Sequence, residues 1–150
     1  MRKKPLKLER DAYQVALDLL ARREHARVEL EQKLQKKGFP ESRIHQALQQ
    51  LTEKGFQSDE RYIEDFVRSR VYKGNGPLRI LQELRLRGID ESLSRHYMDE
   101  QEIDWLDVAT MTYEKKFGHE PVATLEERAR RSRFMQSKGF PSDIIRKIIK

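Results

Sequence analysis

The chain has 150 residues, 37% of them charged, and a formal net charge of +6 that favours a polyanionic partner. Only 37% of the residues are hydrophobic, so several small cores in series are expected rather than one large core. Cysteine is absent, which excludes disulfides and thiolate metal sites and favours a reducing cytoplasm as the setting.

Apolar residues recur with helical spacing along the whole chain. Three sets show the i, i+3, i+4, i+7 pattern that places one stripe on one helix face: Tyr13, Ala16, Leu17 and Leu20; Ile44, Ala47, Leu48 and Leu51; Trp105, Val108, Ala109 and Thr112. No segment alternates with period two over the length of a strand. The sequence therefore predicts an all-α protein.

Three glycines divide the chain at nearly equal intervals. Gly38, Gly88 and Gly139 are spaced by 50 and 51 residues, and each follows a segment rich in Lys and Arg. A glycine there can take the left-handed conformation that ends a helix. The apolar residue that follows each glycine can fold back onto the last helical turn.

Side chains around these glycines repeat as well. Leu34, Leu84 or Met135 stands four residues before each glycine, and Leu48, Met98 or Ile149 stands ten residues after it. Tyr62 and Phe66 precede Gly88 by the same offsets at which Tyr113 and Phe117 precede Gly139. This is an internal repeat of three helices. The helices are predicted at 11–22, 26–37, 41–54, 58–73, 77–87, 90–101, 104–117, 123–138 and 141–149.

The repeats define three tandem units, with boundaries at residues 1–57, 58–103 and 104–150. A unit of about 50 residues is marginal alone, because small domains bury a low fraction of their surface. The units are expected to pack against their neighbours in sequence and to form an elongated, curved body.

The stretch "KGNGP" at Lys73–Pro77 raises the question of a phosphate-binding loop. A Walker-type loop needs Gly-x4-Gly-Lys-Ser/Thr after a strand, and here the lysine precedes the glycines. Gly74 can instead end one helix, and Pro77 suits the first turn of the next. We interpret the stretch as a connector between helices.

Gly55–Asp90, "GFQSDERYIEDFVRSRVYKGNGPLRILQELRLRGID", closely resembles the middle of the RecX family. The matching positions are Phe56, Asp59, Arg61, Tyr62, Phe66, Val67, Arg70, Lys73, Gly74, Gly76, Pro77, Arg79, Ile80, Glu83, Leu84, Arg87, Gly88 and Ile89. The first and third units fit more loosely. One departure is "QSD" at Gln57–Asp59, where the family often has Leu-Asp-Asp; Ser58 still suits a helix N-cap.

The resemblance implies a small cytoplasmic bacterial regulator that binds the recombinase RecA and restrains filament growth, ATP hydrolysis and strand exchange. It implies the same fold of three tandem three-helix repeats. Family-motif positions expected to be structural are Gly55, Asp59, Phe66, Gly76, Pro77, Leu84 and Gly88. We expect a monomer without cofactor that contacts the RecA filament and, weakly, single- or double-stranded DNA.

Charge is unevenly distributed along the chain. Residues 126–150 carry a net charge of +5 and residues 1–10 carry +4, whereas residues 90–107 carry −6. A protein with both a basic and an acidic region suits a protein partner that itself coats DNA. The candidate partner- or DNA-binding residues are Arg70, Lys73, Arg79, Arg87, Arg128, Arg131 and Arg133. For residues 126–138 a solvated helix face, with Glu127 supporting Arg131, remains an equal alternative.

Other side chains favour structure over chemistry. Six aromatics on apolar stripes are expected in the core: Tyr13, Phe66, Trp105, Tyr113, Phe117 and Phe134. Phe39, Phe56 and Phe140 are expected to pack at helix ends. The four histidines lie in different segments, and His96 with Glu100 lacks a third ligand, so no metal site is expected.

No nucleophile–base–orienter set is visible, so catalytic residues are not expected and the chain is not predicted to be an enzyme. No apolar run approaches the roughly 18 residues of a membrane span. The alternative function is a stand-alone helical DNA-binding protein, since three-helix units resemble helix-turn-helix modules in outline. Against it, the units share no consistent set of base-reading side chains.

Overall fold

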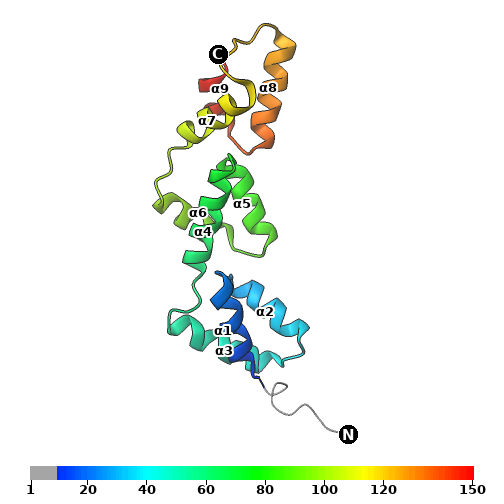
Figure 1. Cartoon of the computed structure of the whole chain (residues 1–150), viewed down its shortest axis with the longest axis vertical. Helices are drawn as coiled ribbons and strands as arrows, with labels where there is room; N and C mark the ends of the chain where they lie inside the picture. Colours follow the sequence, from blue (N-terminus) through cyan, green and yellow to red (C-terminus); the bar gives the residue numbers. More distant parts are fainter. Residues whose placement is uncertain (1–9) are drawn as a thin grey trace. The chain divides into compact units, whose positions relative to one another are not determined.

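The computed structural model describes residues 10–150, which form nine α-helices and no strand (Figure 1). Residues 1–9, which carry most of the predicted N-terminal basic charge, lie outside this range. The helices are α1 (Ala12–Arg22), α2 (Arg27–Lys36), α3 (Glu41–Glu53), α4 (Asp59–Tyr72), α5 (Pro77–Leu86), α6 (Glu91–Glu100), α7 (Trp105–Phe117), α8 (Leu125–Ser137) and α9 (Ser142–Ile148). The predicted all-α class is confirmed, and each helix end falls within two residues of its prediction.

The first three helices and the last three each enclose a small core. In α1–α3 the core holds Leu30, Leu34, Leu48 and Leu51, all with 0% of their surface exposed. In α7–α9 it holds Ala109, Met135, Phe140, Ile145 and Ile149. The chain divides into two compact units, one ending at Tyr62 and the other spanning Ile63–Lys150, so most of α4 and all of α5–α9 belong to one unit. We call α1–α3, α4–α6 and α7–α9 the first, second and third domains.

The repeated glycines end the second helix of each domain, as predicted. Gly38, Gly88 and Gly139 have φ angles of +93°, +88° and +101°. In each case the next residue donates its backbone N–H to the carbonyl five positions earlier, for example Phe39 to Leu34 at 3.3 Å. This closing turn satisfies carbonyls that the helix itself leaves open. The apolar residues predicted four before and ten after each glycine are all buried.

Polar side chains tie the turn before α2 to the turn before α4 in the first unit. Gln57, 2% exposed, accepts a hydrogen bond from Thr52 Oγ1 at 2.8 Å and donates to the His25 carbonyl at 3.3 Å. Asp59 Oδ1 accepts from the Arg27 backbone N–H at 2.9 Å and so caps the start of α2. Gln57 is part of the departure from the family pattern at Gln57–Asp59, and its burial is compensated by these hydrogen bonds.

Phe56 contradicts the prediction for the aromatic residues at helix ends. Phe140 is 2% exposed, and Phe39 packs partly buried against the first core, but Phe56 is 48% exposed. Gly55 (φ +82°) ends α3, the third helix of its domain, rather than the second. The residue after this glycine therefore lacks the core position that Phe140 occupies.

The buried position of His25 predicts that the stability of the first domain depends on pH. Its Nδ1–H donates to the Arg23 carbonyl at 3.0 Å, and its Nε2 lies 3.1 Å from Lys33 Nζ, which donates to it. Burial lowers the pKa of His25, and the neighbouring Arg23 and Lys33 cations also act to lower it, although the Arg23 carbonyl and Glu29 oppose them. The folded state therefore holds the neutral ring to lower pH than the unfolded chain does.

We expect the free energy of unfolding to fall as the pH decreases from about 7.5 to 5.5, because the unfolded chain then binds a proton that the folded state excludes. One proton changes the free energy of unfolding by at most about 1.4 kcal/mol per pH unit. The slope that His25 causes should be smaller than this limit. Urea unfolding followed by circular dichroism measures it. His25→Asn keeps a donor for the Arg23 carbonyl but cannot titrate, so its curve should be flatter; equal slopes would contradict the assignment.

Candidate partner-binding surface

The connector Lys73–Pro77 forms the turn that its sequence predicts. Gly74 takes φ +85° and donates its N–H to the Val71 carbonyl at 2.9 Å, which ends α4. Asn75 Nδ2 donates to the Arg70 carbonyl at 3.2 Å. Pro77 occupies the first turn of α5, where its missing N–H costs no hydrogen bond.

The same connector binds the closing turn of α8, and we call this contact the α5–α8 junction (residues 73–79 with 137–140). Gly76 N–H donates to the Lys138 carbonyl at 2.7 Å, and Leu78 N–H donates to the Gly139 carbonyl at 3.0 Å. The first turn of α5, which has no side-chain cap, thus receives its acceptors from the end of α8. Figure 1 shows this turn of α8 beside the start of α5. Opposite ends of two helix dipoles meet there.

Two glycines allow the backbones to approach so closely. A Cβ atom on Gly76 would lie 2.5 Å from the Gly139 carbonyl oxygen, and one on Gly139 would lie 2.5 Å from Arg79 Cβ. On α7, Thr112 Oγ1 adds a hydrogen bond to the Gly74 carbonyl at 3.0 Å. The junction therefore holds the second and third domains together through backbone contacts that require glycine at these two positions.

Arg70 and Arg79 share one carboxylate beside the junction. Arg70 Nε donates to Glu83 at 2.7 Å and its guanidinium lies 4.1 Å from the centre of the Phe66 ring. Arg79 Nε donates to Glu83 at 3.3 Å and its Nη1 donates to the Ser137 carbonyl at 3.3 Å. Burial acts to raise the pKa of Glu83, but the two arginines outweigh it and lower that pKa. Arg70 is thus chiefly a structural residue.

Lys73, Arg87 and Arg133 are the most accessible of the sequence-predicted bases. All three are exposed, and none forms an ion pair within residues 10–150. The Arg87 guanidinium lies 4.9 Å from the centre of the Phe66 ring, which leaves its N–H groups free to face solvent. These three side chains are available to an acidic or phosphate-bearing partner.

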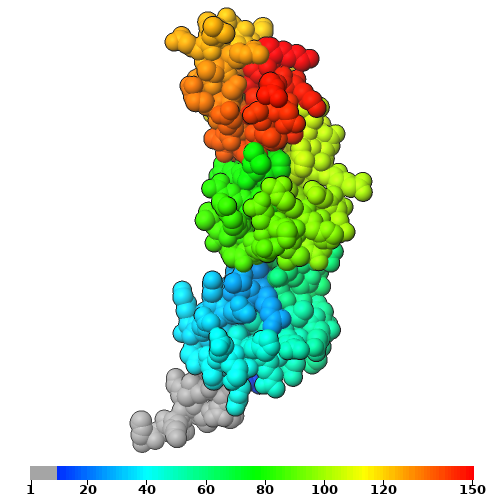
Figure 2. Space-filling view, turned by 180° about the vertical axis from the view of Figure 1, so that it is seen from behind, coloured from blue at the N-terminus to red at the C-terminus, as the bar shows by residue number. Residues whose placement is uncertain are grey.

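Arg128 holds the end of the chain in place. Its guanidinium donates to the Lys150 carbonyl and, at 3.0 Å, to the Ile149 carbonyl. These carbonyls follow α9, which lies beside α8 on the face shown in Figure 2. A cation at a helix C-terminus stabilises the open carbonyls and the helix dipole. Arg128 is therefore already engaged within its own domain.

Arg131 lies in the interior of the third domain. Its side chain is 6% exposed, and Nε donates to Glu127 at 2.7 Å. Nη1 donates to the Tyr113 hydroxyl at 2.6 Å and to the Glu120 carbonyl at 3.0 Å. The i,i+4 pair expected of a solvated helix face is present, but the arginine faces inward. We leave Arg131 out of the proposed surface because no exposed part of it could meet a partner.

The position of Arg131 in the repeat predicts its burial, whereas its charge does not. Arg131 stands eight residues before Gly139, as Leu30 does before Gly38 and Ile80 does before Gly88. Leu30 and Ile80 are both fully buried. The third domain therefore places a guanidinium where the other two domains place an apolar side chain.

Lys138 belongs to the α5–α8 junction, and Lys115 lies beside it on α7. Lys138 Nζ donates to the Lys73 carbonyl at 3.5 Å. Lys115 lies one turn after Thr112 on α7, so it points to the same side as the residue that contacts the connector. Burial lowers the pKa of Lys138, and the cations of Arg79 and Lys115 lower it further.

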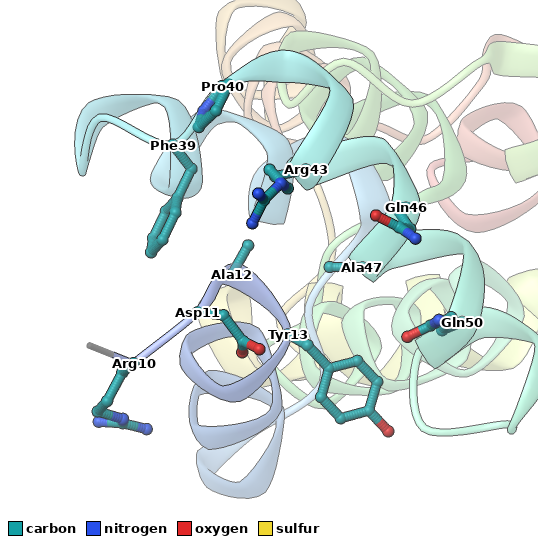
Figure 3. A pocket seen from close by; sticks show the side chains of 10 residues that line it. All are labelled: Arg10, Asp11, Ala12, Tyr13, Phe39, Pro40, Arg43, Gln46, Ala47 and Gln50. Atoms are coloured by element: carbon teal, nitrogen blue, oxygen red, sulfur yellow. The ribbon is translucent and has the colours of Figure 1, made fainter.

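A hollow of about 540 Å³ lies on the first domain (Figure 3). It is lined by the start of α1 and one side of α3, with Arg43 and Tyr13 among the side chains shown. Asp11, at its edge, accepts the Gln14 N–H at 2.9 Å as the N-cap of α1. Its lining contains no nucleophile beside a base.

Metal sites and membrane spans are absent from residues 10–150. That part of the chain holds no group of three or more His, Cys, Asp or Glu side chains arranged to bind a metal ion. It also holds no helix long and apolar enough to cross a bilayer.

The fold defines a protein of three tandem three-helix domains whose second and third domains meet through a glycine-dependent junction. Residues 12–51, 58–96 and 102–149 match the RecX first, second and third three-helix domains in turn. The chain therefore belongs to the RecX family of regulatory proteins.

Curated relatives agree with this assignment. The chain is 44% identical over 131 residues to the regulatory protein RecX of Halorhodospira halophila, covering 87% of this chain and 81% of the relative. It is 37% identical over 139 residues to that of Legionella pneumophila (strain Corby), covering 93% of each. The crystal structure of RecX from Lactobacillus salivarius has the same fold, with a TM-score of 0.78 and 23% identity over 92% of both chains.

Proposed function

We propose that this protein is a non-enzymatic, cytoplasmic regulator that binds the RecA recombinase filament as a monomer and inhibits filament extension, ATP hydrolysis and strand exchange. The observation that carries the proposal is the match of three consecutive RecX domains to residues 12–149. The unpaired bases Lys73, Arg87 and Arg133 support it, because exposed cations suit a filament that presents carboxylates and phosphates.

The direct test measures ATP hydrolysis by RecA on single-stranded DNA while this protein is added. We expect the rate to fall as the protein saturates the filament, and binding to the filament to be stronger than binding to bare DNA. Full ATP hydrolysis at saturating protein would contradict the proposal. Binding to bare DNA alone would favour a stand-alone DNA-binding protein, the candidate that the same cations also support.

A paired variant tests the surface. Arg87→Gln with Arg133→Gln should weaken filament binding by roughly tenfold at low salt, because partly exposed ion pairs contribute about 0–1 kcal/mol each. The difference in affinity between the parent and the variant should shrink as salt rises, because salt screens the charge contacts that only the parent makes. Lys36→Gln with Lys37→Gln removes the same charge from exposed positions in the first unit. Equal losses in the two pairs would show that only net charge matters.

A further inference from the structure

We infer that the α5–α8 junction, together with Lys115 of α7, forms a binding site for a phosphate group, held by Arg79, Lys115 and Lys138. The three cations come from three elements: the first turn of α5, the end of α7 and the turn after α8. Lys138 Nζ is fixed near the Lys73 carbonyl at 3.5 Å, and Arg79 Nη1 near the Ser137 carbonyl at 3.3 Å. Hydrogen bonds at the junction thus hold Arg79 and Lys138 in place before any ligand arrives. Lys115 lies one turn after Thr112, which donates to the Gly74 carbonyl of the same connector.

Nearby carboxylates do not neutralise this group. Glu83 is the one carboxylate that pairs with Arg79 among the described residues, and it is shared with Arg70. Lys115 and Lys138 form no ion pair within residues 10–150. The lowered pKa of Lys138 has burial as its first cause and the Arg79 and Lys115 cations as the others. An anion placed between them would relieve this repulsion.

The chemistry favours phosphate as that anion. Arg79 uses Nε and Nη1 for Glu83 and the Ser137 carbonyl, which leaves its Nη2 N–H groups to donate to a phosphate oxygen. The two ammonium groups can serve the remaining oxygens. The phosphate can come from a nucleic-acid backbone or from a free phosphate ion, and the two sources share this recognition. Because the donors belong to both the second and third domains, a bound phosphate should also stabilise their junction.

The test compares two variants that lose the same charge. The junction variant carries Lys115→Gln and Lys138→Gln. The control carries Lys116→Gln and Lys147→Gln, which are exposed bases of α7 and α9. Lys116 Nζ lies 5.3 Å from the centre of the Phe134 ring. Circular dichroism and thermal unfolding of both variants establish that they fold.

The first probe is a short, fluorescently labelled oligothymidylate, titrated at several salt concentrations without RecA. We expect the junction variant to lose roughly tenfold in affinity, because it removes two solvent-accessible cations whose contacts with phosphate contribute about 0–1 kcal/mol each. The slope of log affinity against log salt should fall by about 0.7, as for one lost phosphate contact on a single strand. The control should lose less in both measurements.

The second probe is inorganic pyrophosphate at constant ionic strength, with the unfolding temperature as the readout. A rise for the parent and the control but not for the junction variant supports a site that accepts free phosphate; a response to the oligonucleotide alone assigns the phosphate to the backbone. Equal losses in both variants, or no response to either probe, overturn the inference. A junction variant that binds DNA normally but no longer binds RecA filaments also overturns it, while leaving the proposed function intact.

Discussion

Gly139→Ala is expected to loosen the third domain from the second. The substitution places a Cβ atom 2.5 Å from Arg79 Cβ and 2.6 Å from its backbone nitrogen, at a φ of +101°. The left-handed backbone costs about 1–2 kcal/mol for a residue with a Cβ atom, and the overlap adds about 1–3 kcal/mol. Thermal unfolding should show the loss, and hydrogen exchange should be faster at the Gly76 and Leu78 amides, whose acceptors lie in the displaced turn.

The repeat supplies a matched control in Gly38→Ala. Gly38 ends the corresponding helix of the first domain with φ +93°, but a Cβ atom there meets nothing within 4 Å. This variant should therefore cost only the backbone strain, and the difference between the two variants measures the overlap at the junction. If both cost the same and the Gly76 amide stays protected, the close approach is not what holds the domains together.

The contrast between these glycines shows what the sequence can and cannot predict. Helix ends were predictable because a glycine in the left-handed conformation, with an apolar residue after it, is a local pattern. The junction was not predictable, because its hydrogen bonds join the backbone of Gly76 to that of Lys138. Backbone N–H and carbonyl groups are present at nearly every residue, so sequence does not mark which of them meet across domains.

The candidate binding residues also fall into those that the sequence could predict and those that it could not. The exposed bases Lys73, Arg87 and Arg133 stay as predicted candidates for partner contact. Arg128 is bound to its own domain by the carbonyls of Ile149 and Lys150, a contact made by residues distant in sequence. Charge identifies which residues could bind a partner, but packing decides which of them face solvent.

Arg131→Ala is expected to be the most destabilising change among the arginines of α8. It would remove the donor to Glu127 and Tyr113 and leave a void at a repeat position that is filled by buried apolar residues in the other domains. We expect the unfolding temperature to fall by about 10 °C or more, measured by circular dichroism. Arg130→Ala is the control, because Arg130 also donates to Glu127 at 2.7 Å but is 56% exposed. The control should lose no more than about 1 kcal/mol.

Arg131→Met separates a structural role from a binding role. Leu30 and Ile80 fill this repeat position with apolar side chains, and replacing a buried ionic group by an apolar one of similar volume is often tolerated. The Met variant should therefore recover much of the stability that Ala loses, although it carries no charge. If it is stable and binds RecA filaments as well as the parent does, Arg131 acts through folding alone. If it is stable but fails to bind, the Arg131 guanidinium contacts the partner directly. Binding would then require a rearrangement that exposes this side chain.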